Sequence, residues 1–211
     1  MCAKRFITRL PVTLHVLAKA PLPGQAKTRL MPLLGQQGAA DAHAELVRFS
    51  VANACRAFAP KRVTLWTALE HQHPLFTALA RQYGVTLTPQ VSGDLGARMR
   101  HALNADPGPS MVIGSDCPSI TPSLLRLCAA QLADHQVVIL PAEDGGYGLI
   151  GTQEDTPSLF HDMPWGSERV LAKTRDRLAA CGLTAAFPAT VWDVDRPEDW
   201  QRWLQFRRKP T

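Results

Sequence analysis

The sequence predicts an α/β protein, a doubly wound domain with a mostly parallel sheet flanked by helices. Short runs rich in β-branched residues alternate with segments of helical length along most of the chain. Polar and glycine-rich stretches follow several of these runs, where strands are expected to end. Alternation of this kind is typical of parallel strands joined by crossover helices, which gives a doubly wound domain.

The first half of the chain supplies three predicted strands and two helices. A helical face repeats at Val47, Val51 and Ala54, and Pro60 ends that helix. Gly84 stands where a glycine commonly stops a helix. The predicted strands cover residues 13–18, 62–67 and 85–88, and the predicted helices cover residues 37–59 and 74–83.

The second half continues the alternation and then departs from it. Strands are predicted at 111–114 and 136–140, with a helix at 122–133 between them. The glycine-rich residues 143–151 then predict a turn and a strand that makes an antiparallel or mixed sheet edge. A helix at 167–180, a short strand at 190–194 and a last helix beginning at Pro197 complete the prediction.

Length and composition favour one cytoplasmic domain over residues 1–211, with its core at about 12–204. The chain is 45% hydrophobic and has no apolar run near the ~20 residues that cross a membrane, nor a signal-peptide pattern. Its five scattered cysteines lack the spacing of a zinc site and favour reduced thiols. The net charge of +5 suits an anionic ligand, whereas the few aromatic residues argue against nucleic-acid binding.

Residues 18–30, which follow the first strand, are the strongest candidate for a phosphate site. Pro21 and Pro23 cannot continue a strand, and Gly24 permits a tight turn or a close approach to a ligand. Lys27 adds a compact charge and Arg29 a planar fork, the two ways in which side chains hold phosphate. The alternative is a solvated basic loop.

Two acidic segments are candidates for metal binding. Asp116 follows the strand at 111–114, where a carboxylate can hold Mg²⁺ together with substrate phosphates. The alternative is that Asp116 caps a turn. Asp193 and Asp195 alternate along a predicted strand end, so at most one of them is expected to face the site. If Asp195 faces Asp116, the two carboxylates could share Mg²⁺ with a triphosphate; the alternative is that Asp195 belongs to the N-cap region of the last helix.

Three further segments offer binding groups. Arg98 lies about one turn into a helix whose start is free to meet an anion, and Asp94 is expected to cap that helix. Asp144 is followed by two glycines that permit close backbone approach, although a plain hairpin turn would use the same residues. Trp165 offers an aromatic face in a loop, either as a platform for a substrate or as a surface anchor.

Several common enzyme classes are poorly supported. The glycine pattern of dinucleotide-binding proteins does not follow the first strand, and the chain has no P-loop motif. It also lacks the Gly-x-Ser-x-Gly elbow of serine hydrolases and the His-x-x-x-His spacing of a metal site.

Five separated motifs together resemble one family. The motifs are residues 19–30, Gln90 with 93–99, 114–118, 144–147 and 164–166. They occur in the same order as in the bacterial GT-A-fold transferases known as radical-SAM/selenodomain-associated transferases. These are glycosyltransferase-like members of the nucleotide-diphospho-sugar transferase superfamily. Residues 193–200 also resemble the closing motif of guanylyl- and cytidylyltransferases, and this resemblance points to Asp195 as a metal ligand. Prolines replace the glycine-rich opening loop of nucleotidylyltransferases, while Lys27 and Arg29 remain.

The resemblance implies a GT-A fold, with a Rossmann-like mixed sheet, and a transferase that uses Mg²⁺ (or Mn²⁺) with an NTP or nucleotide sugar. Nucleotidylyl transfer to an anionic small molecule is slightly favoured over glycosyl transfer, and a non-catalytic nucleotide-binding protein is the alternative from another class. Lys27, Arg29 and Asp116 are the expected catalytic residues, and Asp116 and Asp195 the expected metal ligands. The residues expected to bind the nucleotide, besides Lys27 and Arg29, are Ala18, Gly24, Gln90, Gly93 and Arg98. The residues expected to bind the acceptor are Asp144, Gly145, Gly146, Tyr147 and Trp165.

Overall fold

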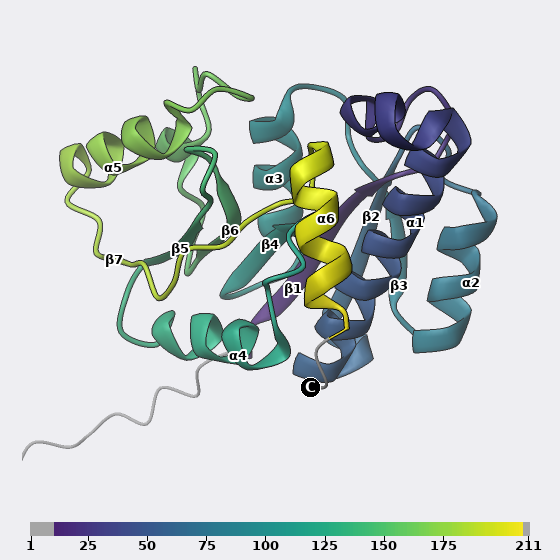
Figure 1. Cartoon of the computed structure of the whole chain (residues 1–211). Coiled ribbons are helices and arrows are strands. Elements are labelled where there is room, and N and C mark those ends of the chain that lie inside the picture. The colour runs from purple at the N-terminus through teal and green to yellow at the C-terminus, as the bar shows by residue number, and fades with distance from the viewer. Residues whose placement is uncertain (1–10, 209–211) are drawn as a thin grey trace, which may run out of the picture.

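A seven-stranded sheet forms the centre of the computed structural model, which describes residues 11–208 (Figure 1). The strand order is β3-β2-β1-β4-β6-β5-β7. Only β6 runs antiparallel to its neighbours. The strands are β1 (Thr13–Lys19), β2 (Val63–Ala68), β3 (Thr86–Pro89), β4 (Ser110–Gly114), β5 (Val137–Pro141), β6 (Tyr147–Thr152) and β7 (Ala185–Ala186).

Six α-helices surround this sheet, and three short 3-10 turns, η1, η2 and η3, complete the secondary structure of the described residues. Gly35, which has φ 71°, interrupts the regular turns near the start of the longest helix. The helices are α1 (Met31–Ala57), α2 (Pro74–Tyr83), α3 (Leu95–Leu103), α4 (Pro122–Gln131), α5 (Val170–Ala180) and α6 (Pro197–Phe206), and the 3-10 turns are η1 (Thr28–Leu30), η2 (Pro60–Arg62) and η3 (Pro157–Leu159).

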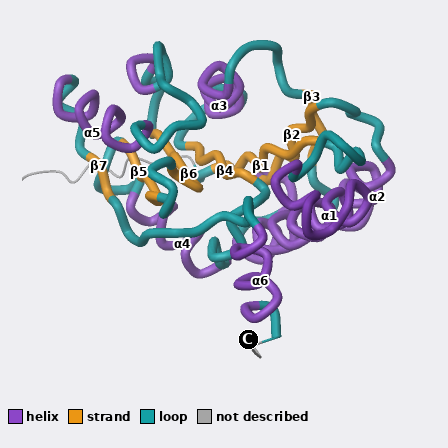
Figure 2. The backbone as a smooth tube through the Cα atoms, turned by 45° about the horizontal axis from the view of Figure 1, so that its top comes forward, coloured by secondary structure: helices purple, strands orange, loops and turns teal. Residues whose placement is uncertain are grey.

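The helices divide between the two faces of the sheet, with α1, α2 and α4 on one face and α3 and α5 on the other (Figure 2). Each face has its own buried cluster. One contains Val47 and Val51 of α1, and the other contains Met99 of α3 and Leu178 of α5. Because both faces are covered, the central strands are almost continuously apolar.

Helix α6 forms an additional layer outside α1. Trp200 and Trp203 join Leu46 in a third buried cluster, and the Trp203 indole donates a hydrogen bond to Glu45 of α1 at 2.9 Å. This packing anchors α6 beside η1 (Thr28–Leu30), the 3-10 turn that ends the loop after β1.

The predicted fold class and the first five strands are confirmed, and two local predictions are wrong. The antiparallel strand β6 lies inside the sheet between β4 and β5 and not at its edge. Residues 190–194 form only an isolated bridge between Val191 and Ala142, and the edge strand is β7. The glycine-rich turn at 143–146 reverses the chain so that β6 can insert beside β4.

No helix within residues 11–208 is long and apolar enough to cross a membrane. Residues 1–10, which include Cys2 and the N-terminal segment without a signal-peptide pattern, and residues 209–211 lie outside the described part of the chain.

Candidate functional site

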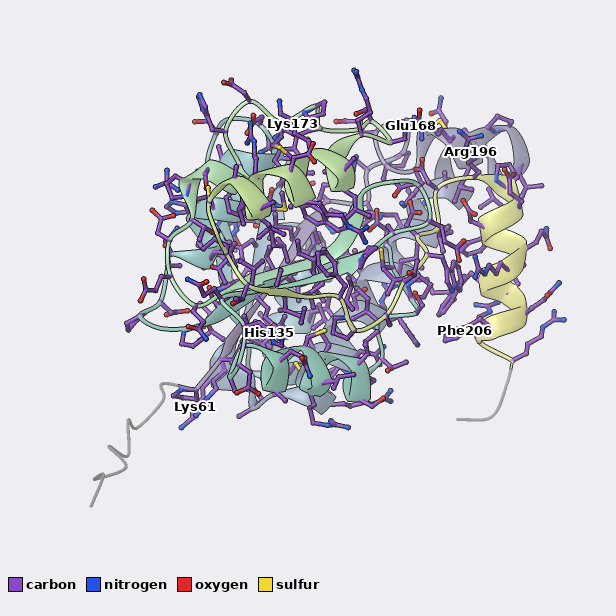
Figure 3. The ribbon with its side chains drawn as sticks, turned by 90° about the vertical axis from the view of Figure 1, so that its left-hand side faces the viewer. Lys61, His135, Glu168, Lys173, Arg196 and Phe206 are labelled. Atoms are coloured by element: carbon purple, nitrogen blue, oxygen red, sulfur yellow. The ribbon has the colours of Figure 1, made fainter. Side chains whose placement is uncertain are left out.

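The predicted functional residues gather at the carboxyl ends of the parallel strands. This end of the molecule carries Glu168 and Arg196, whereas Lys61 and His135, which precede β2 and β5, lie at the opposite end (Figure 3). Ligands of open parallel sheets bind at this edge, because the loops there follow the strands directly.

The loop after β1 is tightly shaped, as its prolines and glycine predict. Gly24 has φ 81°, a conformation that glycine takes without strain. Lys27 itself has φ 48° and ψ 47°, which is left-handed and uncommon for a residue with a side chain. This backbone conformation precedes η1 and directs the lysine inward, leaving its side chain only 7% exposed.

Lys27 binds two carboxylates that are far apart in the sequence. Its ammonium donates a hydrogen bond to Asp116 at 3.2 Å and lies 3.9 Å from a carboxylate oxygen of Asp195. The guanidinium of Arg29, which is mostly exposed, pairs with the other oxygen of Asp195. The structure therefore brings Lys27, Arg29, Asp116 and Asp195 together in one cluster.

The charges of this cluster are mutually dependent. Burial disfavours the charged form of Lys27, but Asp116 and then Asp195 outweigh it and raise the lysine pKa above its ordinary value. Partial burial likewise works against an ionised Asp116, but the charge and hydrogen bond of Lys27 keep the pKa of that carboxyl below its ordinary value. The ion pair therefore persists at neutral pH.

Hydrogen bonds between distant loops fix the two acidic segments against each other. The backbone N–H of Val194 donates to the carbonyl of Asp116 at 2.9 Å, and Trp192 N–H donates to the hydroxyl of Ser119 at 3.1 Å. Asp199 accepts from the backbone N–H of Asp195 and of Arg196, so Asp199 caps α6. The N-cap residue of α6 is Arg196 and not Asp195.

Asp193 also faces the site, contrary to the prediction that only one of the two aspartates would do so. Residues 193–195 are not part of a strand, so their side chains do not alternate, and both aspartates line the same cavity. Burial, together with the nearby carboxylates of Asp116 and Asp144, raises the pKa of Asp193 to about 6.

Gln90 joins the ends of the first two strands. Its side-chain amide donates to the carbonyl of Ala18 at 3.2 Å and to that of Trp66 at 3.0 Å. These two bonds place Gln90 beside Ala18, and nucleotide binding by this pair stays a prediction. They also give Gln90 a structural role that the sequence did not indicate.

The start of α3 has the predicted cap, but its arginine is engaged locally. Asp94 accepts a hydrogen bond from Ala97 N–H at 2.8 Å, which confirms it as the N-cap. The Arg98 guanidinium donates to the carbonyl of Gly93 at 3.1 Å, within the same turn. Phosphate binding by Arg98 stays a prediction.

The predicted acceptor residues come from two loops that are packed together. The rings of Tyr147 and Trp165 meet edge to face, with centroids 6.3 Å apart. Trp165 also packs on Gly96, where a Cβ atom would lie 2.6 Å from the indole. The Tyr147 hydroxyl and the Trp165 indole nitrogen are buried without a hydrogen-bond partner in the described structure.

Beside the Lys27 cluster lies a cavity of about 500 Å³ whose lining is mainly acidic. It includes Asp144, at the β5–β6 turn, and Glu168, in the loop that precedes α5. Sequence reasoning missed Glu143, Glu168 and Arg196, since exposed charged residues in loops carry no periodic signal. The lining comprises Arg29, Glu143, Asp144, Gly166, Ser167, Glu168, Trp192, Asp193, Asp195, Arg196 and Asp199.

The Asp116 and Asp195 carboxylates fit a divalent cation shared with a phosphate ligand. Their side chains remain 39% and 31% exposed and converge on one buried ammonium. Mg²⁺ commonly takes one or two carboxylates and completes its shell with water and phosphate oxygens. Within residues 11–208, no group of three His, Cys, Asp or Glu side chains has the arrangement of a metal site.

A family model matches residues 51–167, and its description reads "Uncharacterized protein conserved in bacteria (DUF2064)". The chain belongs to the DUF2064 family. Its match includes β4 with Asp116 and the turn that carries Asp144, whereas Lys27 and Asp195 lie outside the matched residues. No curated protein matches the chain.

Solved structures resemble the whole of this DUF2064 protein. A "putative nucleotide-diphospho-sugar transferase" from Desulfovibrio desulfuricans G20 is 24% identical with a TM-score of 0.79, and the match covers 95% of this chain and 89% of that one. A CMP:2-keto-3-deoxy-manno-octonic acid synthetase complexed with CTP is 12% identical, with a TM-score of 0.61 and coverage of 94% and 98%. Rv0371c from Mycobacterium tuberculosis H37Rv, in complex with manganese, is 16% identical, with a TM-score of 0.55 and coverage of 93% and 99%.

At these identities the likeness shows the fold. The predicted Rossmann-like α/β fold, with a mostly parallel mixed sheet flanked by helices, is confirmed.

Proposed function

We propose that this DUF2064 protein is a divalent-metal-dependent transferase that uses a nucleotide substrate. The observation that carries the proposal is the buried Lys27 ammonium, which joins the carboxylates of Asp116 and Asp195 at the carboxyl ends of the strands. A buried cation beside two partly exposed carboxylates suits a metal–phosphate ligand. The CTP and manganese complexes of two structural neighbours support this choice.

In this proposal the protein supplies position and charge. Lys27 and Arg29 hold the phosphates. Asp116 and Asp195 would hold Mg²⁺ or Mn²⁺, which when bound would neutralise charge on the leaving phosphates. For nucleotidylyl transfer, which we favour slightly, an acceptor oxygen attacks the α-phosphorus, pyrophosphate leaves and the acceptor loses one proton. Gln90 and Ala18 contact the nucleoside, and Tyr147 and Trp165 contribute to the acceptor side.

Glycosyl transfer from a nucleotide sugar is the second candidate. Two observations favour it: the likeness to the Desulfovibrio protein and the acidic cavity beside the cluster, which suits hydroxyl groups. In that reaction the same cluster would hold the diphosphate of the donor, and a nucleoside diphosphate would leave.

The leaving group distinguishes the two reactions. The protein is incubated with Mg²⁺, a mixture of acceptors and either NTPs or nucleotide sugars, and the released phosphates are identified. Pyrophosphate from an NTP supports nucleotidylyl transfer, and a nucleoside diphosphate from a nucleotide sugar supports glycosyl transfer. Asp116→Asn is expected to lower turnover at least about 100-fold, because it removes charge next to the metal. Asp134→Asn, at an exposed aspartate outside the site, is the matched control.

Unchanged turnover and Mg²⁺ dependence in Asp116→Asn would overturn the metal assignment. Nucleotide binding that neither Mg²⁺ nor Asp116→Asn alters, without any released phosphate, would instead indicate a non-catalytic nucleotide-binding protein.

A further inference from the structure

The cavity beside Lys27 has a charge that the proposed phosphate cluster does not explain. Six of its lining residues are acidic and only two are basic. Two of the acidic side chains are already engaged: Glu143 binds Arg202 through two hydrogen bonds, at 2.7 and 3.1 Å, and Asp199 caps α6. Asp195 pairs with Arg29 and Lys27.

The other three carboxylates, those of Asp144, Glu168 and Asp193, form no ion pair within the described residues. Asp144 accepts one hydrogen bond, from the backbone N–H of Gly146 at 2.9 Å, and so retains most of its capacity as an acceptor. An ionised carboxylate only accepts hydrogen bonds, through two oxygens. These three lining residues therefore give the cavity a surplus of hydrogen-bond acceptors.

The backbone holds these carboxylates in place. Gly145, with φ 86°, lies so close to the loop before α5 that a Cβ atom on it would be 2.3 Å from the carbonyl oxygen of Glu168. Leu171 N–H also donates to the carbonyl of Gly145 at 2.9 Å. Asp144 and Glu168 thus belong to one packed unit, and they flank the same cavity from two loops.

We propose that the acceptor of this transferase carries several hydroxyl or ammonium groups and no negative charge where it enters the cavity, as in a sugar, amino sugar or polyol. Such groups donate hydrogen bonds to the carboxylates of Asp144, Glu168 and Asp193, whereas a phosphate ester would be repelled by them. This inference rests on the proposed function and replaces the anionic acceptor that the sequence favoured.

Binding of matched compounds to the nucleotide-free protein tests this inference separately from turnover. Glucose, glucosamine, glycerol and myo-inositol are each compared with their monophosphate ester by ligand-observed NMR and calorimetry. At least one compound without phosphate is expected to bind roughly tenfold more tightly than its ester, and Glu168→Lys is expected to remove that preference. Glu154→Lys makes the same charge change at an exposed residue outside the cavity and is expected to keep it.

The inference is overturned if the phosphate esters bind more tightly or if neither set of compounds binds. It is also overturned if Glu168→Lys and Glu154→Lys change the preference equally. Glu168→Gln, which removes the charge without adding one, is expected to give an intermediate preference. Thermal shifts with NTPs, measured in parallel, report on the nucleotide site. An NTP shift without the expected acceptor preference would therefore overturn this inference and leave the proposed function intact.

Discussion

Lys27 adopts a left-handed backbone conformation, and its ammonium lies between two carboxylates from the turn after β4 and the segment before α6. Left-handed geometry at a residue other than glycine costs about 1–2 kcal/mol, and such strain is typical of functional sites. The sequence predicts the charge of Lys27 and its place after β1. It does not predict the backbone conformation, which depends on carboxylates about 90 or more residues away.

His15 is a buried residue whose charge state matters for stability. It lies in β1, is 0% exposed, and its Nδ1 atom accepts a hydrogen bond from the Trp66 indole at 3.0 Å. Burial lowers the pKa of His15 to about 4, with only a small opposing effect from Asp106. The neutral imidazole is therefore the form that fits the folded protein.

Acid should destabilise the protein through His15. The pKa of His15 is about 6.5 in the unfolded chain and about 4 in the folded protein. The free energy of unfolding therefore keeps the full contribution of neutral His15 above pH 6.5 and loses it as the pH falls toward 4. His15→Asn keeps an acceptor for Trp66 and does not titrate. Between pH 7 and 4, its free energy of unfolding should fall by about 3 kcal/mol less than that of the wild type.

Chemical denaturation at several pH values, followed by tryptophan fluorescence, measures this difference. His101→Asn, at an exposed histidine that also contacts the Trp66 ring, is the control and should behave like the wild type. Parallel pH profiles for the wild type and His15→Asn would contradict the buried neutral state.

Among the elements, the β5–β6 turn packs closely against the loop before α5. Its glycines predict a turn, and the structure confirms it. The sequence misplaces β6 at a sheet edge, because strand order depends on pairing between β4 and β6 and not on the turn itself. The sequence of residues 190–194 likewise predicts a strand, but in the structure this segment forms hydrogen bonds with the loop that follows β4.

Gly145→Ala tests how tightly this turn packs against the loop before α5. Gly182 provides a matched control, because both glycines have positive φ but only Gly145 has a close neighbour. Gly182→Ala should cost about 1–2 kcal/mol from backbone strain alone. Gly145→Ala should cost a further 1–3 kcal/mol or so, since the new methyl group meets the Glu168 backbone.

The free energy of unfolding of both variants, measured by denaturant titration, gives the comparison. Gly145→Ala should also weaken acceptor binding more than nucleotide binding, because the displaced loops carry Asp144 and Glu168. Equal losses of stability in the two variants would show that the loops are not in the tight contact described.

In the whole molecule, the ends of the parallel strands and helix α6 together position the charged residues of the Lys27 cluster. Parallel strands deliver Lys27 and Asp116 to one edge, and α6, packed on α1 through Trp200 and Trp203, holds Asp195 opposite them. The helical and strand periodicities predict the sheet and most helices, since these depend on local sequence. The meeting of residues 27, 116 and 195 depends on long-range packing, and only the resemblance pointed to Asp195.

We propose that the Lys27 cluster binds a metal–nucleotide complex. The most direct test is the shift in melting temperature caused by each NTP with and without Mg²⁺, measured for the wild type, Lys27→Met and Lys61→Met. Lys61 is exposed at the opposite end of the strands and serves as the matched control (Figure 3).

At a nucleotide concentration about 100-fold above the Kd, binding adds about 2.7 kcal/mol to stability, which is roughly 5–10 °C for a chain of this size. We expect this shift for at least one NTP in the presence of Mg²⁺, its retention in Lys61→Met and its loss in Lys27→Met. A shift that is independent of Mg²⁺, or one that Lys27→Met retains in full, would contradict the account.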